Sequence, residues 1–346
     1  MANKTFRILS IDGGGLRGII PVKILQKLEE LTGKRIYEMF DLVAGTSTGG
    51  IISCASTVKG ADGKPKFTLA DIEQLFAEKA NTIFPATSGI GNIFRGIKNL
   101  FKPEFSPDGL ESVLEGYFSD ECIADCLTPL FIPSYDLANN RALFFKTRQA
   151  LSDSNMNARL MDVCRATSAA PVTFPAYIFK FIDSGAPTDN PMRTCIDGGV
   201  YMNNPEVGAF VEVSRYADKN PYNRPDLTYS DICILSLGTG HYSSVITEKQ
   251  GIDWGILDWV TNISDIMMQG VNQASDYEGQ ELTKNAHHLR LQVDIKDLKY
   301  DDLTDSSAAT RDYLLNEVNN QIFSNPTTMD AFKKYIIDAD LGRGRS

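Results

Sequence analysis

The stretch FRILSIDGGGLRG, residues 6–18, decides the fold class of this 346-residue chain. Its first six residues, Phe6–Ile11, are mostly apolar and predict a buried strand, which the run Asp12-Gly-Gly-Gly closes abruptly. From Gly18 to Leu31 the apolar residues recur at helical spacing. A strand, a tight glycine turn and a helix in this order are typical of the first unit of a parallel sheet.

The same order repeats further along the chain. Asp41–Ala44 predicts a short buried strand, Gly45–Gly50 a second glycine turn, and Ile51–Thr57 a helix of small residues. A third turn, Asp197-Gly-Gly, follows the short strand Arg193–Ile196. We therefore predict a three-layer α/β/α fold with a mostly parallel central sheet. Because ligands bind at the carboxyl ends of parallel strands, the three turns are expected to converge on one site.

The remaining pattern fits the same domain. Further strands are predicted at Pro129–Tyr135 and Ala142–Lys146, which we expect to pair, and at Asp231–Leu237 and His288–Val293. Further helices are predicted at Leu69–Ala80, Ala158–Ala169, Pro205–Ala217, Trp254–Asn285 and Ser306–Ile322. On the long helix, Trp254, Trp259, Met267 and Met268 are expected to pack into the core. No stretch resembles an interdomain linker, so we predict a single domain over residues 1–346.

Composition restricts the function classes and the compartment. The net charge of −10 argues against a nucleic-acid polymer as partner, because such binding requires a basic face. The six cysteines are scattered without metal-ligand spacing, and no disulfide framework is expected. Neither a signal-peptide core nor an apolar run of about 20 residues is present. We predict a cytoplasmic protein.

One local segment departs from this acidic character. In residues 92–102 the side chains of Ile93, Phe94, Ile97, Leu100 and Phe101 share one helical face, and Arg95, Lys98 and Lys102 lie largely opposite. Such a basic amphipathic segment suits a peripheral contact with the inner face of the membrane or an active-site lid. An ordinary helix that packs its apolar face on the core is the alternative.

Ser47 is the candidate nucleophile. Gly45-Thr-Ser-Thr-Gly49 matches the pattern G-x-S-x-G, in which a sharp strand-to-helix turn lifts a serine hydroxyl above the sheet. Gly45 and Gly49 permit the crowding of such a turn, and the helix that follows places its positive end near a developing oxyanion. A plain glycine turn is the alternative, and the strand before and helix after Ser47 favour the nucleophile.

The first glycine turn is the candidate oxyanion hole. Successive backbone amides of Gly13, Gly14, Gly15, Leu16 and Arg17 can form a nest for negative charge. Arg17 has two possible roles, to steady this loop or to neutralise a phosphate head group. The loop also satisfies the dinucleotide fingerprint G-x-G-x-x-G, but the acidic residue which that motif requires at the end of the next strand is missing there. A purely structural loop is the third alternative.

The general base has two candidates. Asp197 lies in a turn at a strand end, where a carboxylate comes close to neighbouring turns, although Asp before Gly often binds only its own loop amides. A carboxylate of ordinary pKa, about 3.9, is a weak base for a hydroxyl, so an oxyanion hole and a desolvated dyad must supply much of the rate. The alternative is a triad in the order Ser47, Asp197, His241. The other two histidines, His287 and His288, are expected to be surface or packing residues.

The three turns in this order resemble the signatures of the patatin-like phospholipase family. Two more stretches, Cys164–Pro171 and Leu235–Gly240, also resemble that family, so the likeness spans about residues 5–300. The segment 301–346 is then a C-terminal helical remainder. Arg17 stands where plant members often have lysine, which keeps the positive charge.

The resemblance implies an activity and a mechanism. It implies a lipid acyl hydrolase of the phospholipase A or lysophospholipase type that cleaves fatty-acyl esters of membrane phospholipids through a Ser47–Asp197 dyad. It implies an oxyanion hole at the amides of residues 13–16, no metal and no organic cofactor. Some compact bacterial members of similar length are antiphage effectors that cyclic dinucleotides activate, so a small nucleotide activator is a further expectation. A non-hydrolytic lipid- or nucleotide-binding module on the same fold is the rival hypothesis.

Overall fold

A central eight-stranded sheet organises the molecule, which is described by a computed structural model over residues 5–85, 103–182, 191–242, 252–283 and 287–344. Seven strands lie in the order β5-β6-β3-β2-β1-β7-β9, and β4 pairs with β3. Their bounds are β1 Phe6–Ile11, β2 Leu42–Gly45, β3 Leu130–Asp136, β4 Arg141–Lys146, β5 Tyr177–Phe179, β6 Arg193–Asp197, β7 Ile232–Leu237 and β9 His288–Leu291. A separate ladder joins β8 (His241–Tyr242) to β10 (Asp294–Ile295).

Parallel pairing dominates the centre of this sheet, as predicted. The pairs β3–β2, β2–β1, β1–β7 and β7–β9 are parallel, whereas β4, β5 and β6 are joined by antiparallel pairs. The predicted hairpin between Pro129–Tyr135 and Ala142–Lys146 is confirmed as β3–β4. The three-residue strand at one edge, β5, has no periodic signal in the sequence and was not predicted.

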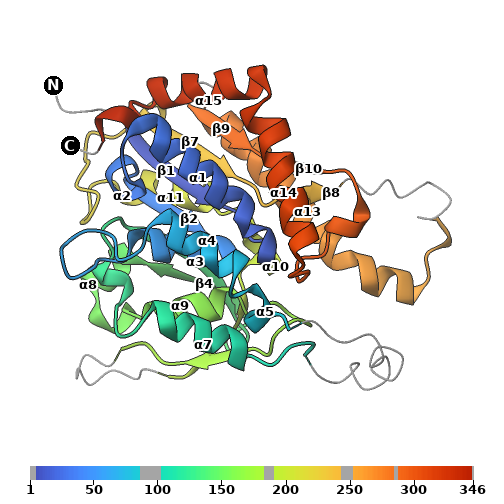
Figure 1. The fold of residues 1–346 in the computed structure, drawn as a ribbon. Helices are drawn as coiled ribbons and strands as arrows, with labels where there is room; N and C mark the ends of the chain where they lie inside the picture. Colours follow the sequence, from blue (N-terminus) through green and yellow to red (C-terminus); the bar gives the residue numbers. More distant parts are fainter. Residues whose placement is uncertain (1–4, 86–102, 183–190, 243–251, 284–286, 345–346) are drawn as a thin grey trace.

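Helices cover both faces of the sheet (Figure 1). The helices are α1 Ile19–Thr32, α2 Ile36–Met39, α3 Thr48–Thr57, α4 Leu69–Ala77, α5 Ala80–Ile83, α7 Asp108–Tyr117, α8 Thr147–Ser152, α9 Leu160–Thr167, α10 Gly199–Met202, α11 Glu206–Tyr216, α13 Ile256–Leu282, α14 Ala308–Val318 and α15 Pro326–Asp338. On one face Phe6 and Ile8 of β1 pack with Phe210 and Val213 of α11. On the other, larger face the alternate β1 residues share a core with α1, α3, α9 and the C-terminal helices. The α/β/α layering is confirmed.

The third glycine turn reaches the site by a different route from the one predicted. Phe131 of β3 pairs with both Ala44 of β2 and Lys146 of β4, so β2 and β4 lie on opposite edges of β3. Ser134 of β3 pairs with β4 and with Asp197, so β6 lies on the same edge as β2 but runs the other way. The carboxyl ends of β2 and β6 therefore face each other along one edge of β3. The prediction that parallel strands bring all three turns to the site is therefore wrong for Asp197, which lies on the antiparallel strand β6.

The C-terminal helices are part of the same apolar core. Leu314 of α14 and Phe332 of α15 are buried in the cluster that contains α1. The guanidinium of Arg7, buried in β1, donates hydrogen bonds to the carbonyl oxygens of Ala339, Asp340 and Gly344 at 2.7, 3.1 and 3.0 Å. These bonds tie the last turn of the chain to the first strand.

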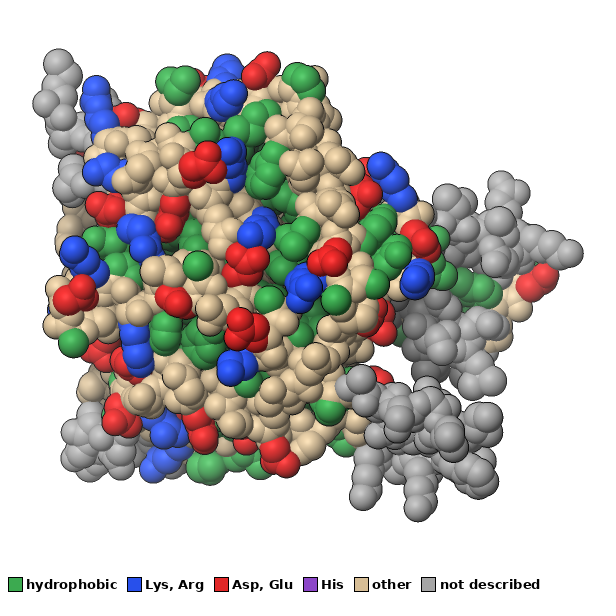
Figure 2. All heavy atoms as spheres, in the orientation of Figure 1, with side chains coloured by type: hydrophobic (Ala, Val, Ile, Leu, Met, Phe, Trp, Pro, Cys, Tyr) green, Lys and Arg blue, Asp and Glu red, His purple; other side chains and the backbone are tan. Residues whose placement is uncertain are grey.

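The surface carries charges of both signs. On the face in Figure 2, acidic and basic side chains are interspersed, and hydrophobic side chains show on the part where α13 projects. Among the described residues no helix has the length and apolar character needed to cross a membrane. All six cysteines are free thiols.

Candidate active site

Ser47 sits on a strained turn between β2 and α3. Its φ of 55° lies in the left-handed region that non-glycine residues rarely adopt. The neighbouring glycines are required by close backbone approach, because a Cβ on Gly49 would lie 2.2 Å from the carbonyl oxygen of Ile11. A Cβ on Gly45 would likewise lie 2.2 Å from the oxygen of Gly49. The predicted strand, sharp turn and helix are all present around Ser47.

A threonine from α9 holds this turn in place. The backbone amide of Ser47 donates to Oγ1 of Thr167 at 3.0 Å, and that hydroxyl donates to the carbonyl oxygen of Pro133 at 2.6 Å. Thr167 thus bridges the serine turn to β3 at the point where β2 and β6 meet. Sequence reasoning missed this role, although Thr167 belongs to the stretch Cys164–Pro171 that carried part of the family resemblance.

Asp197 is buried at the end of β6 and contacts Ser47. Burial raises the pKa of Asp197 to about 6, although hydrogen bonds from the Gly199 amide and the Ser47 side chain each lower it. The amide of Gly199 donates to Oδ1 at 2.7 Å. A carboxyl group of this pKa is ionised near neutral pH, but is a stronger base than an exposed aspartate.

The amides of the first glycine turn are unequal in their availability. The amide of Gly13 donates to the carbonyl oxygen of Asn203 at 3.1 Å, that of Leu16 to Leu303 at 2.9 Å, and that of Arg17 to Gly14 at 3.1 Å. Among the described residues the amides of Gly14 and Gly15 donate to no acceptor. Of the five predicted donors, these two remain available to an oxyanion.

Neighbouring segments pack closely on this turn. Oγ1 of Thr239 donates to the carbonyl oxygen of Gly13 at 2.7 Å, and a Cβ on Gly14 would lie 2.1 Å from that same Oγ1. Arg17 forms an ion pair with Asp301. The charge of Arg17 is thus compensated within the protein, which favours the first of its two predicted roles, to steady this loop.

A buried ion pair supports the start of the turn and was missed in the sequence. Arg290 of β9 binds Asp12 at 2.5 Å and donates to Oγ of Ser236 at 2.7 Å. Burial raises the pKa of Asp12 to about 6, and Arg290 opposes this rise. No spacing rule links residue 12 to residue 290, so only the pairing of β1, β7 and β9 brings them together.

His241 and His288 differ in their surroundings. His241 lines the same cavity as Ser47 and Asp197, and its backbone amide donates to Val293 at 2.9 Å. Within the described part of the chain, Asp197 has no hydrogen bond or ion pair with a histidine. The side chain of His288 is buried and contacts Glu206, in line with the expected packing role. The arrangement of a triad is thus absent among the described residues.

A large cavity opens over Ser47 and Asp197. Its volume is about 1330 Å³, and both side chains line it together with Gly14 and Gly15. Apolar side chains form much of the wall, namely Ile51, Leu75, Phe76, Ile83, Phe84, Leu110 and Phe174. This apolar part of the wall suits a ligand with a hydrocarbon chain.

Comparison with known sequences agrees with this geometry. The sequence profile described as Patatin-like phospholipase matches residues 9–210. The chain belongs to this family. Patatin-like protein 3 of Arabidopsis thaliana is 33% identical over 319 residues, which cover 83% of this chain and 73% of that protein. Patatin-like protein 2 of Oryza sativa subsp. indica is 29% identical and covers 99% of this chain and 87% of its own length.

As a member of the patatin-like phospholipase family, the chain is a lipid acyl hydrolase. A solved structure, VipD from Legionella pneumophila, has a TM-score of 0.41 and 11% identity over 92% of this chain and 67% of that chain. The matched profile ends within α11, so it does not include Arg290 or Leu303. The predicted amphipathic segment 92–102 lies outside the described residues.

Proposed function

We propose that the chain hydrolyses fatty-acyl esters of phospholipids, with Ser47 as nucleophile and Asp197 as the only general base. The observation that carries the proposal is the contact between a serine on a strained turn and a buried carboxyl group of raised pKa, at the wall of an apolar cavity. These features match what covalent catalysis needs: a nucleophile that faces the cavity, an adjacent base and a site for the acyl chain.

The first half of the reaction forms an acyl-enzyme. Oγ of Ser47 attacks the ester carbonyl carbon while its proton passes to Asp197. The carbonyl oxygen becomes an oxyanion, which the amides of Gly14 and Gly15 stabilise. When the tetrahedral intermediate collapses, the carbon–oxygen bond to the glycerol breaks, and the leaving alcohol takes the proton from Asp197.

The second half releases the fatty acid. Asp197 removes a proton from a water molecule as that water attacks the acyl-enzyme carbonyl, and the same amides stabilise the second oxyanion. The serine oxygen leaves with a proton from Asp197, so the dyad returns to its starting state. No histidine is required, because one carboxyl group carries the proton in both halves.

Access to lipid in a bilayer requires contact with the membrane surface. On α13, Ile263 and Met267 line the cavity, yet their exposed fractions are 40% and 53%, and Trp259 on the same helix is 45% exposed. The predicted packing of Trp259 and Met267 in the core is therefore wrong. We propose that this exposed apolar face meets the membrane at the cavity mouth, beside any contribution from residues 92–102.

Covalent labelling distinguishes this enzyme from a non-hydrolytic binding module. Incubation with a fluorophosphonate should modify wild-type protein at Ser47, identified by peptide mass spectrometry, and should leave Ser47→Ala unlabelled. The wild-type protein should release free fatty acid and lysophospholipid from mixed phospholipids, and Ser47→Ala should release neither. A folded wild-type protein that shows neither labelling nor product would refute the hydrolase and leave the binding module.

The regulatory role is a separate question. Activation by a cyclic dinucleotide, and with it a role in antiphage defence, follows only from the resemblance to compact bacterial members. Titration of cyclic dinucleotides into the ester-hydrolysis assay tests it: an increase in kcat supports an activator, and an unchanged rate argues against one.

A further inference from the structure

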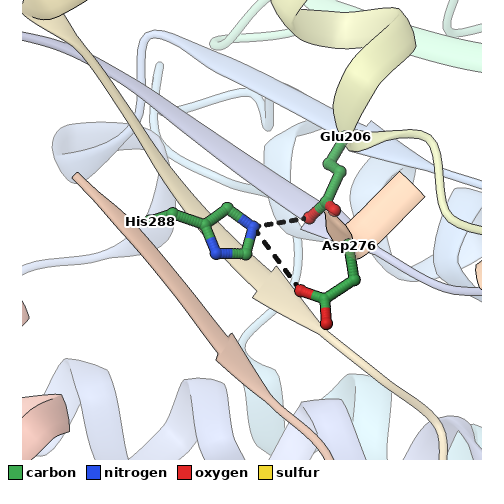
Figure 3. A group of neighbouring side chains, drawn as sticks. All are labelled: Glu206, Asp276 and His288. Carbon is green, nitrogen blue, oxygen red and sulfur yellow. Dashed lines mark hydrogen bonds and ion pairs between the residues drawn. The ribbon is translucent and has the colours of Figure 1, made fainter. Parts of the chain in front are cut away.

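Three side chains from separate elements converge next to the catalytic cavity. Glu206 begins α11, Asp276 lies on α13 and His288 begins β9, and Figure 3 shows the three side chains pointing toward one another. Their ligand atoms all lie within 4.8 Å of one another. Nε2 of His288 is 3.2 Å from Oε2 of Glu206 and 4.0 Å from Oδ1 of Asp276. Atoms that share a cation at about 2.0–2.2 Å stand at similar separations, so small side-chain shifts suffice to close the site.

Only one of the two carboxylate oxygens of Glu206 has a hydrogen-bond partner among the described residues. Its side chain is fully buried, and Oε1 has no hydrogen-bond partner among the described residues. The contact with His288 accounts for Oε2 alone. A buried carboxylate oxygen without a partner is costly, and a positive group at Oε1 removes that cost.

The charged side chains around this cluster leave an excess of negative charge. Arg290 carries one positive charge, and it binds Asp12 at 2.5 Å. Asp12, Glu206 and Asp276 interact electrostatically with Arg290 and carry three negative charges as carboxylates, so these four side chains sum to −2. A divalent cation neutralises this group of charges, which agrees with the rule that buried charges are paired or coordinate metals.

A glycine leaves room at this point of α13. Gly279 lies one turn beyond Asp276 on the same helix. A Cβ on Gly279 would come 2.9 Å from Oε1 of Glu206 and 3.1 Å from Nε2 of His288. The absence of a side chain therefore keeps open the space beside the two ligand atoms.

We propose that Glu206, Asp276 and His288 bind a divalent transition-metal cation of the Zn²⁺ or Mn²⁺ class. One imidazole and two carboxylates form a mixed nitrogen and oxygen set, which favours such cations over Ca²⁺ and Mg²⁺. The cation joins α13 to α11 and β9. On the same helix, Asn272 accepts a hydrogen bond from Asn203 at 3.1 Å, so α13 is also held near the glycine turn. The steps proposed at Ser47 and Asp197 do not involve this cation.

Direct metal binding to the full chain tests the site. After treatment with chelator and dialysis, titration calorimetry with ZnCl₂ or MnCl₂ should show one ion per chain, and the metal should raise Tm. The variants His288→Gln and Asp276→Asn should lose both the binding and the rise in Tm. Gly279→Ala should weaken binding at least about tenfold, the effect expected of a change next to a metal ligand.

Gly270→Ala is the matched control. It makes the same change on the same helix, but a Cβ there meets nothing within 4 Å, so metal affinity should not change. Should His288→Gln fail to fold, Glu206→Gln and Gly279→Ala decide the question. Failure of the folded wild type to bind either metal overturns the proposal, as does equal binding by wild type and the folded ligand variants. No substrate is present, so the result does not depend on the proposed hydrolysis.

Discussion

Burial of Asp197 makes its carboxylate a stronger base and also lowers the stability of the fold. Because burial raises the pKa of Asp197 to about 6, the carboxylate form needed for catalysis is lost below that pH. We expect kcat/KM for a soluble ester to rise about tenfold per pH unit below pH 6 and to level off above it. A flat profile between pH 5 and 8, measured on protein that stays folded, would contradict Asp197 as base.

The stability effect has the opposite direction. The folded protein binds the Asp197 proton more tightly than the unfolded chain does, because the pKa rises from 3.8 to about 6 on folding. Ionisation of Asp197 therefore lowers the free energy of unfolding as the pH rises from about 4 through 6. The full cost above pH 6 is about 3 kcal/mol. Asp197→Asn should therefore raise the free energy of unfolding at pH 7.5 and abolish ester hydrolysis.

Urea unfolding at several pH values checks this prediction. The difference between Asp197→Asn and wild type should shrink as pH falls toward 4. The other buried aspartate of raised pKa, Asp12, is common to both proteins and cancels in the difference. A stability difference that is independent of pH would contradict the raised pKa.

His241 separates the dyad from the triad. Because Asp197 has no histidine partner among the described residues, His241→Ala should keep most of the wild-type kcat. Loss of a triad base instead lowers kcat by several orders of magnitude, about 10⁴ or more. Steady-state kinetics on a soluble ester distinguishes these outcomes, and a loss comparable with that of Ser47→Ala would restore the triad.

At the scale of elements, the surroundings of α13 change along its length. Near its start, Ile263 and Met267 are exposed and line the cavity mouth, whereas Asn272 and Asp276 contact buried polar groups. Ile263→Glu with Met267→Glu should weaken binding to phospholipid vesicles, because burial of apolar area at the membrane is lost and charge is added. Hydrolysis of a short, soluble ester should be nearly unchanged.

The control for this double variant is Ile337→Glu on α15. Ile337 is 75% exposed and lies outside the cavity lining, so its replacement should leave vesicle binding and both hydrolysis rates unchanged. Sedimentation with vesicles measures binding, and Tm reports the fold. Equal vesicle binding by wild type and the double variant would contradict a membrane contact at α13.

At the scale of the whole molecule, the two ends of the chain depend on each other. Arg7 is fully buried, and its three hydrogen bonds go to carbonyl groups of residues 339, 340 and 344. Arg7→Ala should lower the free energy of unfolding by about 3–5 kcal/mol, because it leaves buried carbonyl groups without donors. Calorimetry should show one transition at a lower Tm for this variant, as a single domain requires.

Arg343→Ala is the matched change in the same C-terminal turn. The side chain of Arg343 is 83% exposed and reaches Asp340 at 3.5 Å, so its loss should change the free energy of unfolding by less than about 0.5 kcal/mol. Two separate transitions in either protein would contradict the prediction of one domain over residues 1–346.

Local patterns in the sequence determined the fold class, the family and the turn around Ser47. Each depends on residues adjacent in the chain: the apolar run Phe6–Ile11, and the glycines that allow the close backbone approach beside Ser47. Prediction failed for some helices. The helix expected over residues 69–80 divides into α4 and α5, and α7 and α15 were not predicted. Signals for α15 were present, because Asn325 caps its start and Pro326 is its first residue.

Tertiary structure alone decided how the site is assembled. The meeting of Ser47 and Asp197 depends on β2 and β6 sharing one edge of β3, and strand direction cannot be read from a short apolar run. The partners Thr167 and Arg290 lie 120 and 278 residues from the groups they bind, and no periodicity spans such a distance. The raised pKa of Asp197 likewise comes from burial, a property of the packed molecule that no single stretch of sequence contains.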